Sequence, residues 1–388
     1  AVAFDLRNAA QWTGVDPLRD FSAELLAELR EVGLHIRGHE DWSGTVTIAN
    51  LRVIAAEDAI PRADIRSAPT TATRMQAWDL ACTLSKAWPN PFDPDVVAID
   101  ARIVQADGSE ILVPAFLDQA YRRNRTGAGE RLEAVGAPFW HVRWRPRQAG
   151  AHRWTLELRE QGGAPVVLAS GALTVTDAPA RGYLTRSTAK PDLFAWEDGS
   201  FFYPIGQNVC QAVDHVPPVK RWSFPEPTDE GTFTFDRYFA RMADAGMNAA
   251  RVWMTPWSHG IEGRADWEGF RGAGRYNLAQ AWKVDRLLDE GERLGIGLIL
   301  TLHHMSEFNS AWLSRAWKDS ALNAIHGGPL RDPEDFYTDA EVRRLYHQRV
   351  RYLVARWGSH PALLAWELFG EANLMPGCDF GGPVPESC

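Results

Sequence analysis

Cysteine is scarce in this chain, which has only Cys82, Cys210, Cys378 and Cys388 among its 388 residues. None of them lies in a CxxC pair, and no histidines gather at the spacing of zinc ligands. A structural zinc site is therefore not expected, because such sites need about four suitably spaced cysteines or histidines. A disulfide between Cys378 and Cys388 in an oxidising compartment and two free thiols are both open interpretations.

Long apolar runs, an excess of basic residues and a phosphate-binding motif are missing as well. No run of about 18 apolar residues is present to cross a membrane. The net charge of −9 argues against a nucleic-acid partner. The N-terminus has no Met and neither the basic nor the apolar region of a signal peptide, so we expect it to be processed or cut.

Tryptophan, by contrast, is abundant, with 17 residues, as many as phenylalanine. Flat indole faces bind the apolar faces of rings and also bind cations, although many of these side chains must belong to the core. A hydrophobic content of 45% and a charged content of 23% are typical of a soluble globular protein. The length favours two or three domains.

The first two segments are predicted to be a partial β-rich module and a linker. Residues 1–60 end in the strand-like stretch GTVTIANLRVI, which resembles the last strand of a carbohydrate-binding jelly roll. The chain is therefore expected to begin inside such a module, with an ordinary β-rich appendage as the alternative. Residues 61–73, PRADIRSAPTTAT, are polar and contain prolines, which is typical of a linker.

Residues 74–178 are predicted to form a β-sandwich. Alternating apolar residues, typical of strands that bury one face, occur at Val97, Ile99, Ala101 and Ile103, at Trp140, Val142 and Trp144, and at Trp154, Leu156 and Leu158. Turn signals such as Asp107-Gly108 separate these stretches at intervals typical of a sandwich. The stretches NPFDPDVVAIDARIVQADG and WHVRWRPRQAGAHRWTLEL resemble the immunoglobulin-like sandwich that precedes the barrel in a set of bacterial glycoside hydrolases. The resemblance implies a domain that packs against a barrel.

Residues 183–388 are predicted to form β/α units. The expected strands are FFYPIGQNV (201–209), NAARVWM (248–254), GLILTLHH (297–304) and ALLAWELF (362–369). A helix is expected between each pair, and this succession favours a parallel sheet. The fourth strand is almost wholly apolar, so we expect it to be buried on both faces. The interpretation is the first half of a (β/α)8 barrel, since a barrel needs eight units. A doubly wound sheet is the alternative, but FFYPIGQNV lacks the GxGxxG motif.

Polar and aromatic residues follow the expected strands, where the loops of a barrel build the catalytic face. These candidates are Asn208, Arg251, Trp253, Trp257, His303, His304 and Glu371. A rim with an acid, imidazoles, a guanidinium and indoles suits a polar, ring-shaped substrate. The long segment after the third strand, which contains Trp312, is expected to form a wall of the cleft.

The stretches GQN, NAARVWM, RYLVARWGSHPALLAWEL and WELxxE together resemble clan A glycoside hydrolases, particularly the family 5 cellulases and mannanases. The resemblance covers residues 196–373 and implies that Glu371 is the general acid/base. It also implies that Arg251 supports the nucleophile, and that His303 and Asn208 hold the sugar together with nearby tryptophans. The expected substrate is a polysaccharide, and a secreted or periplasmic protein is expected. No cofactor is needed, because two carboxyl groups suffice for this chemistry.

The sequence departs from the family pattern in two places. Gly370 stands where the family has an asparagine that contacts the 2-hydroxyl of the sugar. The nucleophilic glutamate of the family lies on the seventh strand, which we expect beyond the end of this chain. The chain is therefore expected to be an inactive fragment of a retaining hydrolase. The alternative is a non-catalytic carbohydrate-binding protein that keeps an aromatic cleft.

Overall fold

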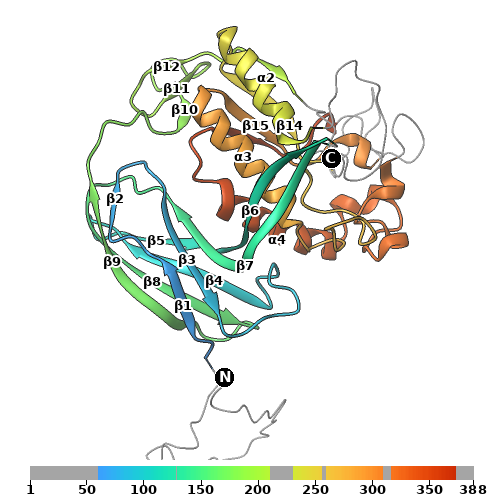
Figure 1. Ribbon diagram of the computed structural model, residues 1–388, viewed down its shortest axis with the longest axis horizontal. Coiled ribbons are helices and arrows are strands. Elements are labelled where there is room, and N and C mark those ends of the chain that lie inside the picture. Colours follow the sequence, from blue (N-terminus) through green and yellow to red (C-terminus); the bar gives the residue numbers. More distant parts are fainter. Residues whose placement is uncertain (1–59, 128, 210–229, 256–258, 309–315, 373–388) are drawn as a thin grey trace, which may run out of the picture. The chain divides into compact units, whose positions relative to one another are not determined.

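The computed structural model describes residues 60–127, 129–209, 230–255, 259–308 and 316–372 (Figure 1). The chain divides into two compact units, Ala1–Ile60 and Pro61–Cys388. All elements described below belong to the second unit. The jelly-roll-like segment expected at 1–60 lies outside the described residues except for Ile60, so that interpretation stays a prediction.

Two β-sheets make up the first part of the second unit. One has the strand order β1-β3-β7-β6, with β1 Ala63–Ser67, β3 Trp78–Leu84, β7 Gly129–Trp144 and β6 Phe116–Thr126. The other has the order β2-β9-β8-β4-β5, with β2 Thr71–Thr73, β9 Val166–Thr176, β8 Gly150–Glu160, β4 Val97–Val104 and β5 Glu110–Pro114. Neighbouring strands run antiparallel, except for β2 and β9, which run parallel.

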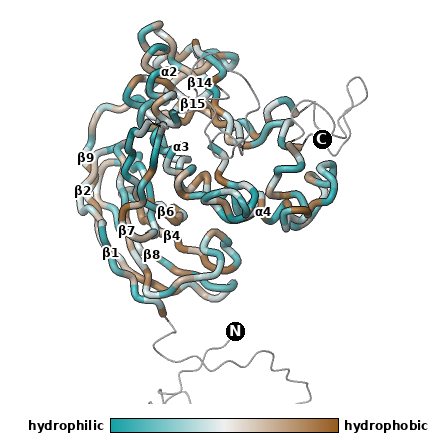
Figure 2. The backbone as a smooth tube through the Cα atoms, turned by 45° about the vertical axis from the view of Figure 1, so that its right-hand side comes forward, coloured by the Kyte–Doolittle hydropathy of each residue, from teal (hydrophilic) through white to brown (hydrophobic). Residues whose placement is uncertain are grey.

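A shared hydrophobic core lies between these two sheets. Hydrophilic and hydrophobic residues follow one another along their strands (Figure 2), because successive side chains of a strand point to opposite faces. Trp78 of β3 is 1% exposed and contacts the rings of Trp144 and Trp154, with centroids 6.2 and 6.1 Å away. Several of the abundant tryptophans are thus core residues. The immunoglobulin-like topology remains a prediction.

The linker predicted at 61–73 is wrong. Residues Ala63–Ser67 form β1, which pairs with β3 so that Ile65 lies opposite Cys82, and Thr71–Thr73 form β2. Both strands lie at the edges of their sheets, where one side of the backbone and one face of the side chains meet water. Their polar composition therefore reflects an edge position and not a lack of structure.

A four-stranded parallel sheet follows, with strands in sequence order: β13 Gly206–Asn208, β14 Ala249–Trp253, β15 Gly297–Thr301 and β16 Leu363–Glu367. The single strand expected at 201–209 is instead split. Phe201–Phe202 (β12) pairs with β11 (Phe194–Trp196), which pairs with β10 (Leu184–Arg186), in a separate antiparallel sheet. Pro204 separates the two parts and has no N–H to donate to a sheet.

Three described helices connect the parallel strands, as the sequence predicts, and each buries one face. They are α2 (Thr232–Asp244), α3 (Leu278–Leu294) and α4 (Ala340–Trp357). Helix α3 begins at Asn277, whose side chain accepts from the N–H groups of Ala279 and Gln280, and ends at Gly295 with a left-handed φ of 73°. Between β15 and α4, the described residues form four short 3-10 helices: η2 Met305–Glu307, η3 Ala316–Asp319, η4 Ala324–His326 and η5 Pro333–Tyr337.

The expectation that the fourth strand is buried on both faces is also wrong. Residues Leu363, Leu364, Trp366 and Glu367 of β16 are half-buried, Ala365 is exposed, and the following Leu368 is 57% exposed. Within the described part of the chain, β16 and β13 form the two edges of the parallel sheet. An apolar strand at an open edge is what four units of a barrel would leave. The half-barrel remains a prediction.

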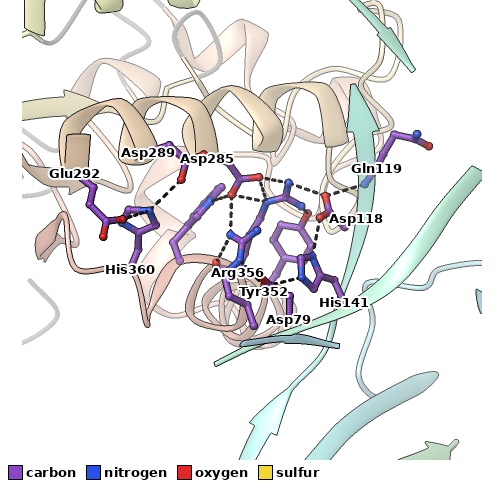
Figure 3. Close-up of polar contacts among 12 residues, drawn as sticks. Asp79, Asp118, Gln119, His141, Asp285, Asp289, Glu292, Tyr352, Arg356 and His360 are labelled. Carbon is purple, nitrogen blue, oxygen red and sulfur yellow. Dashed lines mark hydrogen bonds and ion pairs between the residues drawn. The ribbon is translucent and has the colours of Figure 1, made fainter. Parts of the chain in front are cut away.

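A buried charge cluster joins the two-sheet part to helices α3 and α4. Figure 3 shows Arg356 of α4 between Asp118 of β6 and Asp285 of α3. The Nη2 atom of Arg356 lies 2.7 Å from Oδ1 of Asp118, and the side chain is 0% exposed. Arg143 of β7 adds a contact of 3.1 Å to Asp285. A buried charge is tolerated only when paired, so these residues lock the two parts together.

His141 extends this cluster into the first sheet. Its Nδ1 lies 2.9 Å from Oδ2 of Asp118, and its Nε2 lies 2.8 Å from Oδ1 of Asp79 (Figure 3). Both ring nitrogens can donate at once only in the imidazolium form. Burial opposes that form, but the hydrogen bonds to Asp118 and Asp79 raise the pKa of His141 above its usual value.

We expect the contribution of His141 to stability to depend on pH. Because the pKa is raised in the folded state, the stabilisation is fully present below the unfolded value of 6.5 and is lost as pH rises through the folded pKa. The substitution His141→Gln should lower the free energy of unfolding by about 3 kcal/mol at pH 6, and by less at pH 9. Urea unfolding across this range measures the difference.

His152→Gln is the matched control, because the ring of that buried histidine contacts the backbone carbonyl of Gln148 and no carboxylate. A difference between wild type and His141→Gln that stays constant from pH 6 to pH 9 would contradict the imidazolium assignment.

Candidate active site

The ends of the four parallel strands bring the predicted rim residues together. Nη1 of Arg251, on β14, donates to Oδ1 of Asn208 at the end of β13, at 3.2 Å. Beyond β15 and β16, His304 and Gly370 form a further parallel bridge, which sets His304 beside Glu371. The carboxyl ends of parallel strands meet at one edge, and the structure therefore places Asn208, Arg251, His304 and Glu371 on one rim.

Glu367, which sequence reasoning did not single out, organises this rim. Its Oε2 and Oε1 atoms accept from Nε and Nη2 of Arg251 at 2.5 and 2.8 Å, and Oε2 also accepts from Oγ1 of Thr301 at 2.5 Å. Burial works against the charge, but the hydrogen bonds from Arg251 and Thr301 keep the pKa of Glu367 below its usual value. The signal for Glu367 in the sequence was its position as a lone carboxylate within the apolar stretch ALLAWELF. A carboxylate that is partly buried needs a hydrogen-bond or ion-pair partner.

Glu371 presents the accessible carboxylate of the rim. Its side chain is 51% exposed, and its φ of 57° lies in the left-handed region that non-glycine residues seldom adopt. The backbone just before it is fixed, because Gly370 N–H donates to the carbonyl of His303 at 2.7 Å and Met305 N–H donates to that of Gly370 at 3.2 Å. Strained backbone held by its surroundings is a common feature of functional sites.

The imidazole of His304 contacts the carboxylate of Glu371. Its Nε2 lies 3.0 Å from Oε2 of Glu371, and its ring stacks on Trp253 with centroids 3.8 Å apart and planes 21° from parallel. Trp253 is 7% exposed. His304 covers one face of the indole and little of it is accessible, so this geometry does not support the predicted role of Trp253 as a surface for sugar, which stays a prediction. Trp253 instead fixes the position of His304.

His303 points away from the rim, so this geometry does not support its predicted contact with sugar, which stays a prediction. Successive residues of an extended segment point to opposite sides, and only His304 faces Glu371. The His303 ring is 3% exposed, lies among Phe308, Phe336, Tyr346 and Phe369, and its Nε2 accepts from Nη1 of Arg349 at 3.0 Å. Burial and the charge of Arg349 lower the pKa of His303, which is a neutral core residue.

The absence of a side chain at Gly370 has a steric explanation. A Cβ atom there would lie 2.8 Å from Nη2 of Arg251, 3.0 Å from Cδ2 of His304 and 3.2 Å from Cγ2 of Thr301. The asparagine expected from the family pattern would therefore require the Arg251 guanidinium to shift.

The two remaining predicted site residues, Trp257 and Trp312, lie outside the described residues. Within the described ranges, no three or more His, Cys, Asp or Glu side chains are arranged to hold a metal ion. No helix in the described parts of the chain is long and apolar enough to cross a membrane.

Comparisons with known proteins point to glycoside hydrolases. A probable mannan endo-1,4-beta-mannosidase C of Aspergillus terreus is 24% identical over 235 residues, which are 57% of this chain and 51% of that protein. A probable mannan endo-1,4-beta-mannosidase A of Aspergillus clavatus is 30% identical over 99 residues, 25% of this chain and 24% of that protein. No family model matches the chain.

A structural comparison covers more of the molecule. The crystal structure of a Bacteroides vulgatus protein, provisionally assigned as a glycoside hydrolase, matches with a TM-score of 0.52 at 16% identity. The match covers 80% of this chain and 51% of that one, and the chain therefore shares the fold of that part. The chain spans about half or less of the length of the relatives that it matches.

We predict that Gly370→Asn destabilises the chain, because the new side chain displaces Arg251 and leaves Glu367 without its bidentate partner. The expected loss in the free energy of unfolding is about 1–3 kcal/mol, typical of overpacking. Gly127→Asn is the control, since a Cβ at Gly127 meets no atom within 4 Å. Equal unfolding free energies for the two variants would show that the space beside Gly370 is not restricted.

Proposed function

We propose that this chain belongs to a clan A glycoside hydrolase of the family 5 type, in which Glu371 is the general acid/base. The observation that carries this proposal is the accessible Glu371 carboxylate at the tip of β16, on one rim with Asn208, Arg251 and His304. In (β/α)8 enzymes this end of the sheet carries the catalytic residues. The similarity to mannan endo-1,4-beta-mannosidases supports the same assignment.

The proposed reaction is retaining hydrolysis of a glycosidic bond. One carboxylic acid protonates the leaving oxygen, while a second carboxylate about 5–5.5 Å away attacks the sugar and forms a glycosyl intermediate. Glu371, with the greater exposure, takes the first role. Glu367 is a poor nucleophile, because Arg251 and Thr301 already occupy both of its oxygens. We assign the nucleophile to the part of a longer protein that corresponds to the unmatched half of the relatives.

The proposed substrate is a polysaccharide, and β-mannan is the first one to test because the matched relatives are named for it. A polymer of this size does not enter cells intact, so we place the protein outside the cytoplasm. A second candidate function is non-catalytic carbohydrate binding. The only other described carboxylate on this rim, Glu367, is paired with Arg251 and is therefore not available as a second catalytic carboxylate.

The decisive experiment compares Glu371→Gln with wild type in a longer protein that supplies the remaining barrel units. Glutamine keeps the shape but has no proton to donate, and general acid catalysis is typically worth about 10²–10⁴-fold. We expect a loss of that size on mannan and a much smaller loss on activated aryl glycosides, whose leaving groups depart without a proton. Azide should restore turnover of the activated substrate, because it attacks the intermediate without a general base.

The 388-residue chain is the control and should bind mannan fragments with little or no turnover. If Glu371→Gln loses activity equally on mannan and on activated aryl glycosides, and azide has no effect, Glu371 is not the general acid/base. Binding of mannan by the longer protein with no hydrolysis of any glycoside would favour the binding function.

A further inference from the structure

We infer that His304 is a neutral imidazole that carries its proton on Nε2 and donates a fixed hydrogen bond to Oε2 of Glu371, so that any proton on this carboxyl group lies on Oε1. The tautomer stands on the geometry of the chain alone. Its consequence for catalysis rests on the proposed function of Glu371.

The local backbone decides which nitrogen of His304 lacks a proton. His304 is the N-cap of η2, and the backbone N–H of Ser306 points at its Nδ1, 3.3 Å away. A backbone N–H can only donate, so Nδ1 must be the acceptor. The Ser306 hydroxyl, 2.7 Å from the same nitrogen, can then only donate to it. The single proton of a neutral ring is therefore on Nε2.

The capping arrangement and the stacked indole hold the ring in place. The Oε1 atom of Glu307 accepts from the backbone N–H of His304 at 2.9 Å and completes a capping box. Trp253 covers one face of the ring at 3.8 Å. A ring flip would break the contact with Ser306 and turn a carbon atom toward Glu371. Nε2–H consequently keeps one direction, toward Oε2 of Glu371 at 3.0 Å.

The surroundings of His304 keep the ring neutral. Burial lowers its pKa, and the charge of Arg251 acts in the same direction, against the opposing effect of Glu371 and Glu307. His304 is 4% exposed. A second proton would have to sit on Nδ1, where it would face the N–H of Ser306. Neutrality thus agrees with the hydrogen-bond geometry.

The two oxygens of Glu371 have different roles in this arrangement. Oε2 accepts from Nε2–H whether the carboxyl group is ionised or protonated, so the transferable proton occupies Oε1. In the proposed glycosylation step, the bond between Oε1 and its proton breaks and the proton moves to the glycosidic oxygen, while the nucleophilic carboxylate bonds to the anomeric carbon and the bond from that carbon to the glycosidic oxygen breaks. In the hydrolysis step, Oε1 takes a proton from water, while the water oxygen bonds to the anomeric carbon and the bond from that carbon to the nucleophilic carboxylate breaks. His304 keeps its own proton throughout and acts as a positioning residue.

The test is nuclear magnetic resonance on the 388-residue chain with 15N-labelled histidines. Long-range 1H–15N correlations distinguish the two neutral tautomers, and His304→Gln identifies the signals of His304 among the 11 histidines. We expect the Nε2-protonated form from pH 6 to pH 8. Its Nε2–H should exchange with water on the order of tenfold more slowly than that of the exposed His347.

Two variants of Glu371 make the test specific. Glu371→Gln keeps a carbonyl oxygen that can accept, so the slow exchange should persist. Glu371→Ala removes the acceptor, so the exchange should accelerate, while the tautomer set by Ser306 stays. Ser306→Ala should keep the tautomer too, because the backbone N–H remains.

An Nδ1-protonated ring, a doubly protonated ring at pH 7, or exchange that is equally slow in Glu371→Ala would each overturn the inference. None of these readouts needs enzymatic activity. A failed activity test with the expected spectra would therefore remove the proposed function and leave the tautomer assignment standing.

Discussion

The ion pair between Arg251 and Glu367 is the interaction on which the rim depends. Arg251 belongs to β14 and Glu367 to β16, while Thr301 of the intervening β15 donates to the same carboxylate. Through Nη1 the guanidinium also contacts Asn208 at the end of β13, so Arg251 and Glu367 together contact residues of all four strands. Charge-assisted, bidentate pairs of this kind are strong and directional. Gly370 leaves the space that the pair needs, and the neighbouring Glu371 is thereby set at the edge of a fixed polar layer.

The two-sheet part contributes to this site indirectly. Helices α3 and α4 precede β15 and β16 in the chain, and their Asp285 and Arg356 form a buried cluster with Asp118 of β6. Removing one partner of such a buried pair typically costs about 3–5 kcal/mol, because an uncompensated charge remains. The two-sheet part is therefore not an independent appendage of the parallel sheet. It supplies Asp118, one of the two carboxylates that pair with the buried Arg356 of α4.

Much of the fold could be predicted from periodicity, because apolar stripes at helical spacing and alternation in strands follow directly from burial. The strands within residues 61–73 could not be predicted, since a polar edge strand and a linker have the same composition. In the site, the position of Glu371 after an apolar strand was informative. The opposite orientations of His303 and His304 depend on the register of β15, and the role of Glu367 depends on a partner 116 residues away, Arg251. Neither is visible in a local pattern.

The central claim is that the rim holding Glu371 is one half of a two-carboxylate active site. The most direct measurement is a crystal structure of the longer protein after labelling with a fluorinated glycoside that traps the glycosyl intermediate. We predict that the labelled carboxylate lies on the same rim, about 5–5.5 Å from the Glu371 carboxyl group. A labelled residue at the opposite end of the sheet, or one beyond about 9 Å from Glu371, would contradict the account.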